Sequence, residues 1–132
     1  MSFDIERIHK AARRVQSFLK KNSRRPGADA VHHLRTSTRS LETALTTLGL
    51  DSKKRVARLL RDLGKVRKRA GKVRDMDVLT ANALSAKPDG EEDCRVQLLE
   101  YLGAERRNYD GKLHRTIEKI GTRLRRDLKQ AG

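Results

Sequence analysis

Apolar residues recur at spacings of three and four along almost the whole chain, and this periodicity constrains the fold more than any other feature. The first such series is Ile5, Ile8, Ala12, Val15 and Leu19. Spacing of this kind places apolar side chains along one face of a helix. Aromatic residues make up only 3% of the 132 residues, so a core must be built mainly from Leu, Val, Ile and Ala. Such a core suits helix-on-helix packing better than a sheet, and we predict an all-α fold.

The glycine, proline and helix-capping residues between these series predict where the first helices begin and end. A helix over residues 3–21 ends before Pro26-Gly27. A second over residues 30–48 has Asp29 as its expected N-cap and Gly49 just beyond its C-terminus. A third over residues 52–70 is expected to start with a cap from Asp51 or Ser52 and to stop at Gly71.

The second half of the chain predicts a short helix over residues 74–86, a loop at residues 87–90 and a long last helix. Val78, Leu79 and Leu84 are the expected anchors of the short helix. The long one begins near Glu91 and runs almost to the C-terminus. Its near-heptad seam is Leu98, Leu102, Tyr109, Leu113, Ile117, Ile120, Leu124 and Leu128. We expect one domain over residues 1–132, an antiparallel helical bundle whose long C-terminal helix outreaches its partners and favours a homodimer.

The charge of the chain indicates an anionic partner. Lys and Arg number 32 against 17 Asp and Glu, which is a net charge of +15. From residue 53 to residue 74 there are eleven bases and a single acid, Asp62. An excess of this size repels itself in the folded state, and a polyanion relieves that repulsion.

Other features bear on the compartment and on the reaction chemistry. The N-terminus has no apolar signal region, and no stretch approaches the ~18 apolar residues that span a bilayer. The single cysteine, Cys94, excludes an internal disulfide, so we expect a cytoplasmic protein without a membrane partner. His32 and His33 diverge by ~100° on a helix and cannot easily share a metal ion. No catalytic constellation is found, and no cofactor or metal site is predicted.

One helical segment carries a cationic stripe beside an apolar seam. His32, Arg35 and Arg39 share a face over roughly 10 Å of helix. Arg presents a planar fork that matches phosphate oxygens. Lys65, Lys68 and Lys72 share one side of the next helix or its end. The alternative interpretation of these residues is a solvated helix face with no ligand.

Two short motifs resemble the CHAD family, the conserved-histidine α-helical domain. They are Val-His-x-Leu-Arg-x-x-Thr-Arg at residues 31–39 and Gly-x-Val-Arg-Asp-x-Asp-Val-Leu at residues 71–79. The resemblance covers roughly residues 29–124. It implies packed helical bundles that bind inorganic polyphosphate through a basic channel, without catalysis, and often an association with polyphosphate granules.

The resemblance also implies which residues act. The expected polyphosphate-binding set is His32, Arg35, Arg39, Lys65, Lys68, Lys72, Arg74 and Arg106. Asp75 is expected to be structural or to orient Arg35 or His32 from behind, and Asp77 to cap the short helix. The chain departs from the family pattern at Ser40 and Glu42, where bases are usual. It is also long enough for only one of the family's two helical halves, so it is either a half that dimerises or a fragment.

Two other functions are weighed against polyphosphate binding. A charge of +15 is sufficient for non-specific nucleic-acid binding, although few aromatic residues are available to stack on bases. An enzyme acting on phosphoanhydrides would need carboxylates that hold a metal ion, and Asp75 and Asp77 are the only candidates. The sequence favours a non-enzymatic binder of polyphosphate, with nucleic-acid binding as the alternative.

Overall fold

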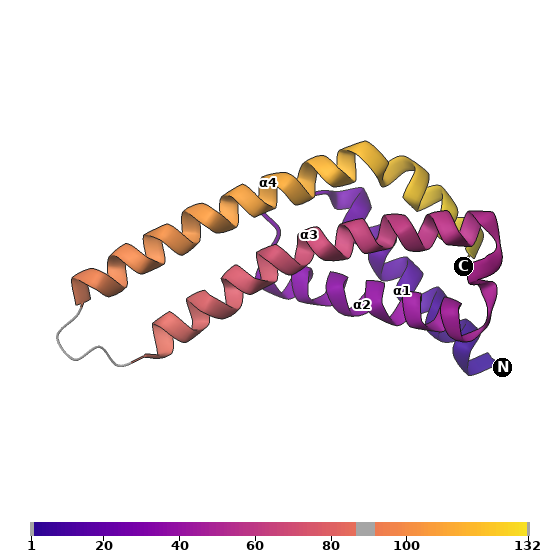
Figure 1. Cartoon of the computed structure of the whole chain (residues 1–132), viewed down its shortest axis with the longest axis horizontal. Coiled ribbons are helices and arrows are strands. Elements are labelled where there is room, and N and C mark those ends of the chain that lie inside the picture. The colour runs from indigo at the N-terminus through magenta and orange to yellow at the C-terminus, as the bar shows by residue number, and fades with distance from the viewer. Residues whose placement is uncertain (1, 87–91, 132) are drawn as a thin grey trace.

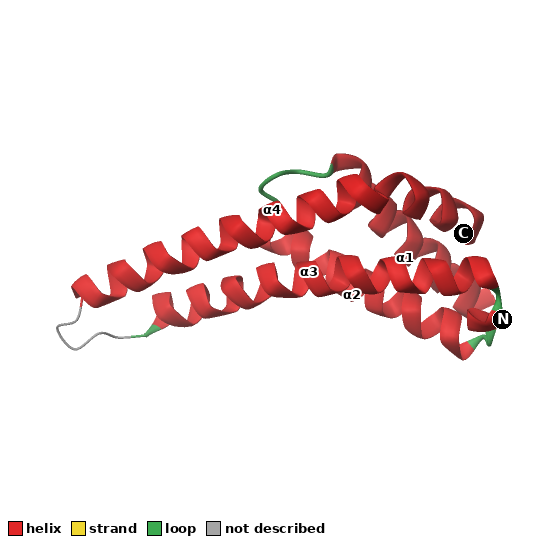
Figure 2. Ribbon diagram, turned by 45° about the horizontal axis from the view of Figure 1, so that its top comes forward, coloured by secondary structure: helices red, strands yellow, loops and turns green. Residues whose placement is uncertain are grey.

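A computed structural model describes residues 2–86 and 92–131 as a bundle of long helices (Figures 1 and 2). Its elements are α1 (Ser2–Lys21), α2 (Ala28–Thr47), a 3-10 turn (Leu50–Ser52), α3 (Lys54–Ser85) and α4 (Glu92–Ala131). These described parts contain no strand. The all-α fold and the long C-terminal helix are therefore confirmed. The loop expected at residues 87–90 lies outside the described residues.

The helices follow one another around the bundle, each packed on its neighbours in the chain, and α4 closes the ring against α1. Among the described residues, the backbones of the two diagonal pairs, α1 with α3 and α2 with α4, do not approach each other closely. The core lies along the common axis and is aliphatic, as the composition predicts. Its most completely buried side chains include Val15, Leu41, Leu63, Leu113 and Leu124. Val15, Leu113 and Leu124 belong to the apolar series given above, and most members of those series are buried. Ile5 and Leu98 of the same series are exposed, so the predicted core faces of the first and last helices are confirmed only in part.

The expected break at Gly71 is wrong. The chain stays helical from Lys54 to Ser85, so the two helices predicted over residues 52–70 and 74–86 are one helix of 32 residues. Ala70 and Val73, on either side of the glycine, are fully buried in the core. Packing of this apolar face stabilises the helix through Gly71 and outweighs the weak helix propensity of glycine, which is about 1 kcal/mol worse than that of alanine.

The helix ends agree only in part with the predicted caps. Gly49 lies just after α2 in the left-handed conformation, with φ of 71°, as predicted for a residue at that position. Asp29 is not an N-cap, because α2 begins at Ala28 after an extended Gly27. Its carboxylate lies instead in the first turn, where it favours the helix dipole. Lys53 precedes α3 without a side-chain cap, so the predicted cap from Asp51 or Ser52 is also wrong.

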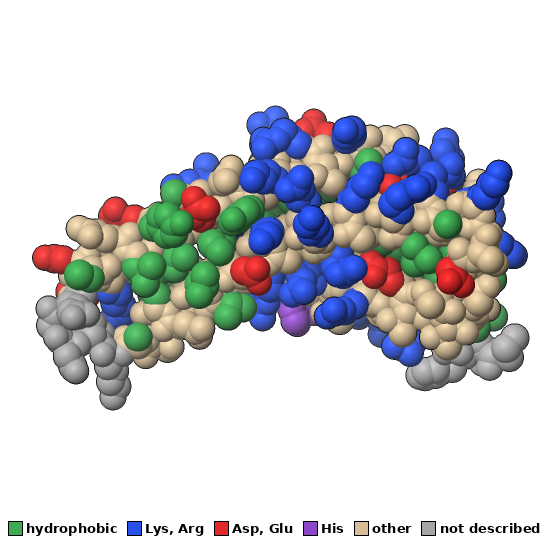
Figure 3. Space-filling model, in the orientation of Figure 1, with side chains coloured by type: hydrophobic (Ala, Val, Ile, Leu, Met, Phe, Trp, Pro, Cys, Tyr) green, Lys and Arg blue, Asp and Glu red, His purple; other side chains and the backbone are tan. Residues whose placement is uncertain are grey.

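The far ends of α3 and α4 extend beyond α1 and α2 as a two-helix arm, which we define as residues 78–85 and 92–101 (Figure 1). Helices of 32 and 40 residues are roughly 48 and 60 Å long, against about 30 Å for α2. The arm is too far out to be covered, so its apolar side chains are exposed (Figure 3). They are Val78, Leu79, Leu84, Val96, Leu98 and Tyr101. The prediction that Val78, Leu79 and Leu84 anchor a short helix is therefore wrong.

Candidate anion-binding groove

A groove of about 370 Å³ runs between α2 and α3, and cationic side chains line it. Arg35 comes from α2, and Lys68 and Lys72 come from α3. The sequence predicted these three residues as ligands. They converge because α2 packs on α3. On each helix the basic residues lie beside the buried apolar face, so the basic residues of both helices face the same cleft.

Arg35 is the most deeply placed of the three. Its side chain crosses α3 at Gly71, where an added Cβ would lie 3.6 Å from the Arg35 Nε. That Nε is buried and has no hydrogen-bond partner among the described residues. Gly71 thus lies inside the helix against the guanidinium and is not a helix stop. An unsatisfied buried donor is costly, and an arriving acceptor such as a phosphate oxygen removes that cost.

Arg67 also lines the groove, although the sequence did not single it out. Its Nε donates to both carboxylate oxygens of Glu42, at 3.1 and 3.2 Å. Glu42 is one of the two positions at which the chain departs from the family pattern. Because both side chains are only partly exposed, at 31% and 20%, the pair occupies the wall of the groove and neutralises one of its cations.

Other predicted ligands lie near the groove but do not line it. His32 and Arg39 are exposed on α2, one turn before and one turn after Arg35, and Lys65 is exposed on α3 one turn before Lys68. Arg74 is half-buried on α3. Together with the groove residues, these side chains form a cationic strip along the surface of both helices, but they do not lie inside the groove.

Of the two aspartates of the second motif, only Asp77 has a role that differs from the predicted one. Asp75 lines the groove with Arg35, but no hydrogen bond or ion pair joins it to Arg35 or His32 within the described residues. Asp77 caps no helix, because it lies in the middle of α3. It accepts a hydrogen bond of 2.6 Å from the Arg106 Nε of α4.

Arg106 is committed to other groups on its own side of the bundle. Its guanidinium binds Asp77, donates to Asp110 Oδ2 at 3.0 Å and donates to the carbonyl oxygen of Pro26 at 2.9 Å. Burial alone lowers the pKa of Arg106, but the bonds and charges of Asp77 and Asp110 outweigh it and raise that pKa above its ordinary value. Arg106 therefore ties α4, α3 and the α1–α2 loop together, and few of its donors are left for a ligand.

Asp110 is the member of this cluster whose hydrogen bonding is incomplete. Its side chain is 3% exposed and its second oxygen, Oδ1, has no hydrogen-bond partner among the described residues. Burial raises the pKa of Asp110, and the Arg106 charge offsets only part of that effect. The carboxylate is thus held in place by Arg106 at a cost in desolvation.

Two further ion pairs fasten α4 to α3. Arg58 binds both oxygens of Asp127 at 2.8 and 2.9 Å, and Arg123 binds both oxygens of Asp62 at 2.9 Å. The hydrogen bonds to these carboxylates raise the pKa of Arg58 and of Arg123. Asp62, the lone acid of the basic run, is fully buried. Its role is to pair α3 with α4.

Three further observations concern metal ligands, thiols and membrane spans among the described residues. Over residues 2–86 and 92–131, no group of three or more His, Cys, Asp or Glu side chains is arranged to hold a metal ion. Cys94 is a free, exposed thiol on the arm. In the same part of the chain, no helix combines the length and the apolar character needed to cross a bilayer.

Comparison with known proteins gives one match. The family model described as the CHAD domain matches residues 6–131, nearly the whole chain. A search of curated proteins found no match, and neither did a search of solved structures. The matched region contains the groove, most of α1 and the whole of α2, α3 and α4.

Proposed function

Because the chain belongs to the CHAD domain family, which is linked to polyphosphate, we propose that it binds inorganic polyphosphate and catalyses no reaction. The observation that carries the proposal is the cationic groove between α2 and α3, with the partnerless Nε of Arg35 at its floor. The absence of catalysis is part of the proposal and rests on the family resemblance. The proposed location is the cytoplasm, in association with polyphosphate granules.

The extent of the cationic strip supports a long polyanion rather than a single phosphate. His32 and Arg39 lie seven residues apart on α2, and so do Lys65 and Lys72 on α3. Each span is roughly 10 Å. Bases spaced along two packed helices can meet successive phosphates of one chain, and each contact releases a counterion.

The proposed contacts divide into a centre and two flanks. Arg35, Lys68 and Lys72 form the centre, because they line the groove. The flanks are His32, Arg39, Lys65 and Arg74. Arg106 is left out of the contact set, because its guanidinium is already bound to Asp77, Asp110 and Pro26.

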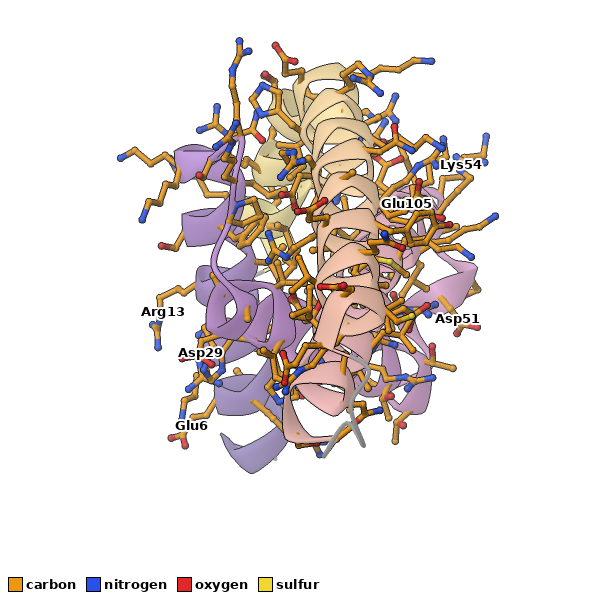
Figure 4. All side chains as sticks on the ribbon, turned by 90° about the vertical axis from the view of Figure 1, so that its left-hand side faces the viewer. Glu6, Arg13, Asp29, Asp51, Lys54 and Glu105 are labelled. Carbon is orange, nitrogen blue, oxygen red and sulfur yellow. The ribbon has the colours of Figure 1, made fainter. Side chains whose placement is uncertain are left out.

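The test is a titration of labelled long-chain polyphosphate with the full chain, at two salt concentrations. We expect the double variant Arg35→Glu, Arg39→Glu to lose most of the affinity. A matched control is Arg7→Glu, Arg13→Glu, which changes the net charge equally at exposed positions of α1 (Figure 4 shows Arg13 pointing away from the bundle). Equal losses in the two variants would mean that only the total charge matters, and the groove would have no special role.

Nucleic-acid binding is the competing proposal. Lys and Arg side chains also cover much of α3 and α4 on the face that Figure 3 shows, and such a surface attracts any polyanion. Duplex DNA and RNA added as competitors separate the two functions. Polyphosphate bound at ~150 mM salt should survive a large excess of nucleic acid, because surface attraction is largely screened there. Displacement by DNA would favour a nucleic-acid surface instead.

We further propose that two copies of the chain associate through the arm. Six large apolar side chains of the arm are exposed, and contiguous apolar patches of this kind mark association surfaces. A second copy would also supply the second helical half that the family resemblance implies. Sedimentation analysis should find a dimer that Leu79→Glu, Leu98→Glu converts to a monomer, while Leu48→Glu at the other end of the bundle does not. A monomeric parent would refute this proposal.

A further inference from the structure

A second cationic pocket, distinct from the groove, lies where the α1–α2 loop meets α4. It encloses about 390 Å³. The loop contributes Arg24 and Arg25, and α4 contributes Arg107, His114 and Arg115. None of these residues belongs to the polyphosphate-binding set proposed above.

The pocket and the groove lie on opposite sides of the bundle. The groove follows the seam between α2 and α3, whereas the pocket lies on the flank of α4 that faces α1. Because the backbones of α2 and α4 do not approach each other closely in the described structure, the two seams are separated by the core. A ligand in one is therefore not in contact with the residues of the other.

The local structure explains why the two loop arginines reach α4. Asn22 ends α1 in the left-handed conformation, with φ of 38°, and this turns the chain across the bundle. Its carbonyl oxygen lies 3.1 Å from the His114 Nδ1 of α4. The His114 side chain is 15% exposed, and it fastens the start of the loop to α4 directly below Arg24 and Arg25.

The four guanidinium groups of the pocket are not used elsewhere in the described structure. Arg24, Arg25, Arg107 and Arg115 make no ion pair within 4 Å over the described residues, in contrast to Arg58, Arg106 and Arg123 on the α3 side. The lining contains a single acid, Glu118, whose carboxylate lies 3.3 Å from the His114 Nε2. The pocket therefore keeps a strong excess of positive charge.

Gly111 lines the pocket beneath the Arg115 guanidinium. A Cβ at this position would lie 3.2 Å from the Arg115 Nη1, so the guanidinium lies flat along α4 over the glycine. Glycine inside a helix is destabilising relative to alanine, and here it leaves space that Arg115 occupies. An alanine would push the guanidinium outward without changing any charge.

We propose that this pocket is a second anion site, which takes a compact phosphate-type oxyanion such as inorganic pyrophosphate. Planar guanidinium groups donate pairs of hydrogen bonds to phosphate oxygens, and several converge here on a space of small-molecule size. The groove is a strip suited to a long chain, whereas this pocket is bounded by a loop and one helix. The proposal does not depend on polyphosphate binding in the groove.

The experiment is an NMR titration of the full-length protein with inorganic pyrophosphate at low salt, with chloride as the reference anion. We expect saturable shifts at residues 22–27 and at Gly111, His114 and Arg115. Gly111→Ala should weaken binding several-fold at unchanged charge, and Arg24→Gln, Arg115→Gln by about tenfold or more, the effect of losing one charge-assisted hydrogen bond. Both variants leave the core intact, and circular dichroism checks that they fold.

The groove variant Arg35→Glu, Arg39→Glu supplies the matched control and separates this proposal from the proposed function. It should lose polyphosphate affinity but keep the pyrophosphate shifts at the pocket. Pyrophosphate shifts confined to the groove would overturn the second site. So would an affinity that Gly111→Ala leaves unchanged, because the position of Arg115 would then not matter.

Discussion

Replacing Gly71 by alanine tests the continuity of α3 directly. In the structure Gly71 lies inside the helix, and a Cβ there meets only the Arg35 Nε at 3.6 Å, an ordinary contact distance. Alanine is better than glycine in a helix interior by about 1 kcal/mol, and nothing here offsets that gain. Gly71→Ala should therefore raise the free energy of unfolding by about 1 kcal/mol.

Gly49 supplies a control with the opposite sign. It has the same freedom of space, with nothing within 4 Å of an added Cβ, but its φ is 71°. A left-handed conformation costs a residue with a Cβ about 1–2 kcal/mol. Gly49→Ala should therefore lower the free energy of unfolding by about 1 kcal/mol, once the reduced freedom of the unfolded chain is counted.

Urea denaturation followed by circular dichroism measures both changes. With a slope of about 1.5 kcal/mol per molar urea, the two midpoints should move in opposite directions by roughly 0.7 M each. A helix that ended at Gly71, as the local sequence suggests, would place that glycine in the left-handed conformation too. Loss of stability in Gly71→Ala, matching that of Gly49→Ala, would refute the continuous helix and with it the geometry of the groove.

Three other predictions follow from burial and pairing. Leu63→Ala should cost about 2–5 kcal/mol in urea denaturation, because Leu63 is fully buried, whereas Leu84→Ala at an exposed position should cost less than ~0.5 kcal/mol. The pKa of Asp110 is raised in the folded state, so the folded protein binds the Asp110 proton more tightly than the unfolded chain does. The stability that this proton contributes is lost as the pH rises from the ordinary pKa of an aspartate through the raised pKa of Asp110 in the folded state. The stability difference between Asp110→Asn and the parent should therefore shift in favour of the variant as pH rises over that window, and a difference independent of pH would contradict this assignment. Glu42→Gln should free Arg67 and tighten polyphosphate binding by about threefold in the titration, more than the exposed control Glu6→Gln, and equal effects would mean that the Arg67 pair does not restrain the groove.

The core could be predicted from the sequence because helical burial repeats over short distances. Val15, Leu63 and Leu113 each belong to a series of apolar residues three or four positions apart, and all are buried. The prediction that a helix ends at Gly71 was wrong, because it relied on a local signal where distant contacts decide. Glycine is a local signal, whereas the burial of Ala70 and Val73 depends on helices that are distant in the sequence.

Only those groove residues could be predicted whose positions follow from the spacing of bases within a single helix. Arg35 was found because its stripe lies within one helix, and Lys68 and Lys72 because they share one side of the next. The pair Arg67–Glu42 spans 25 residues and the pair Arg106–Asp77 spans 29, and no periodicity links their members. Which bases face a ligand and which are held by an acid is decided by packing between helices. For the same reason the pocket at Arg24 and Arg115 has no counterpart in any sequence motif.

The placement of the acids determines how the net charge of +15 is displayed. Asp62, Asp110 and Asp127 are almost fully buried, and each is bound to an arginine that joins two parts of the bundle. Acids used in this way cannot screen the exposed bases of the groove or of the pocket. Added salt should therefore weaken anion binding steeply, because exposed charges are screened. The free energy of unfolding should hold or rise, because salt also screens the repulsion among the exposed bases while the buried carboxylates stay paired. Measuring both against salt separates the charges that hold the bundle together from those that face a ligand, and a parallel loss of both would mean that the two sets are not distinct.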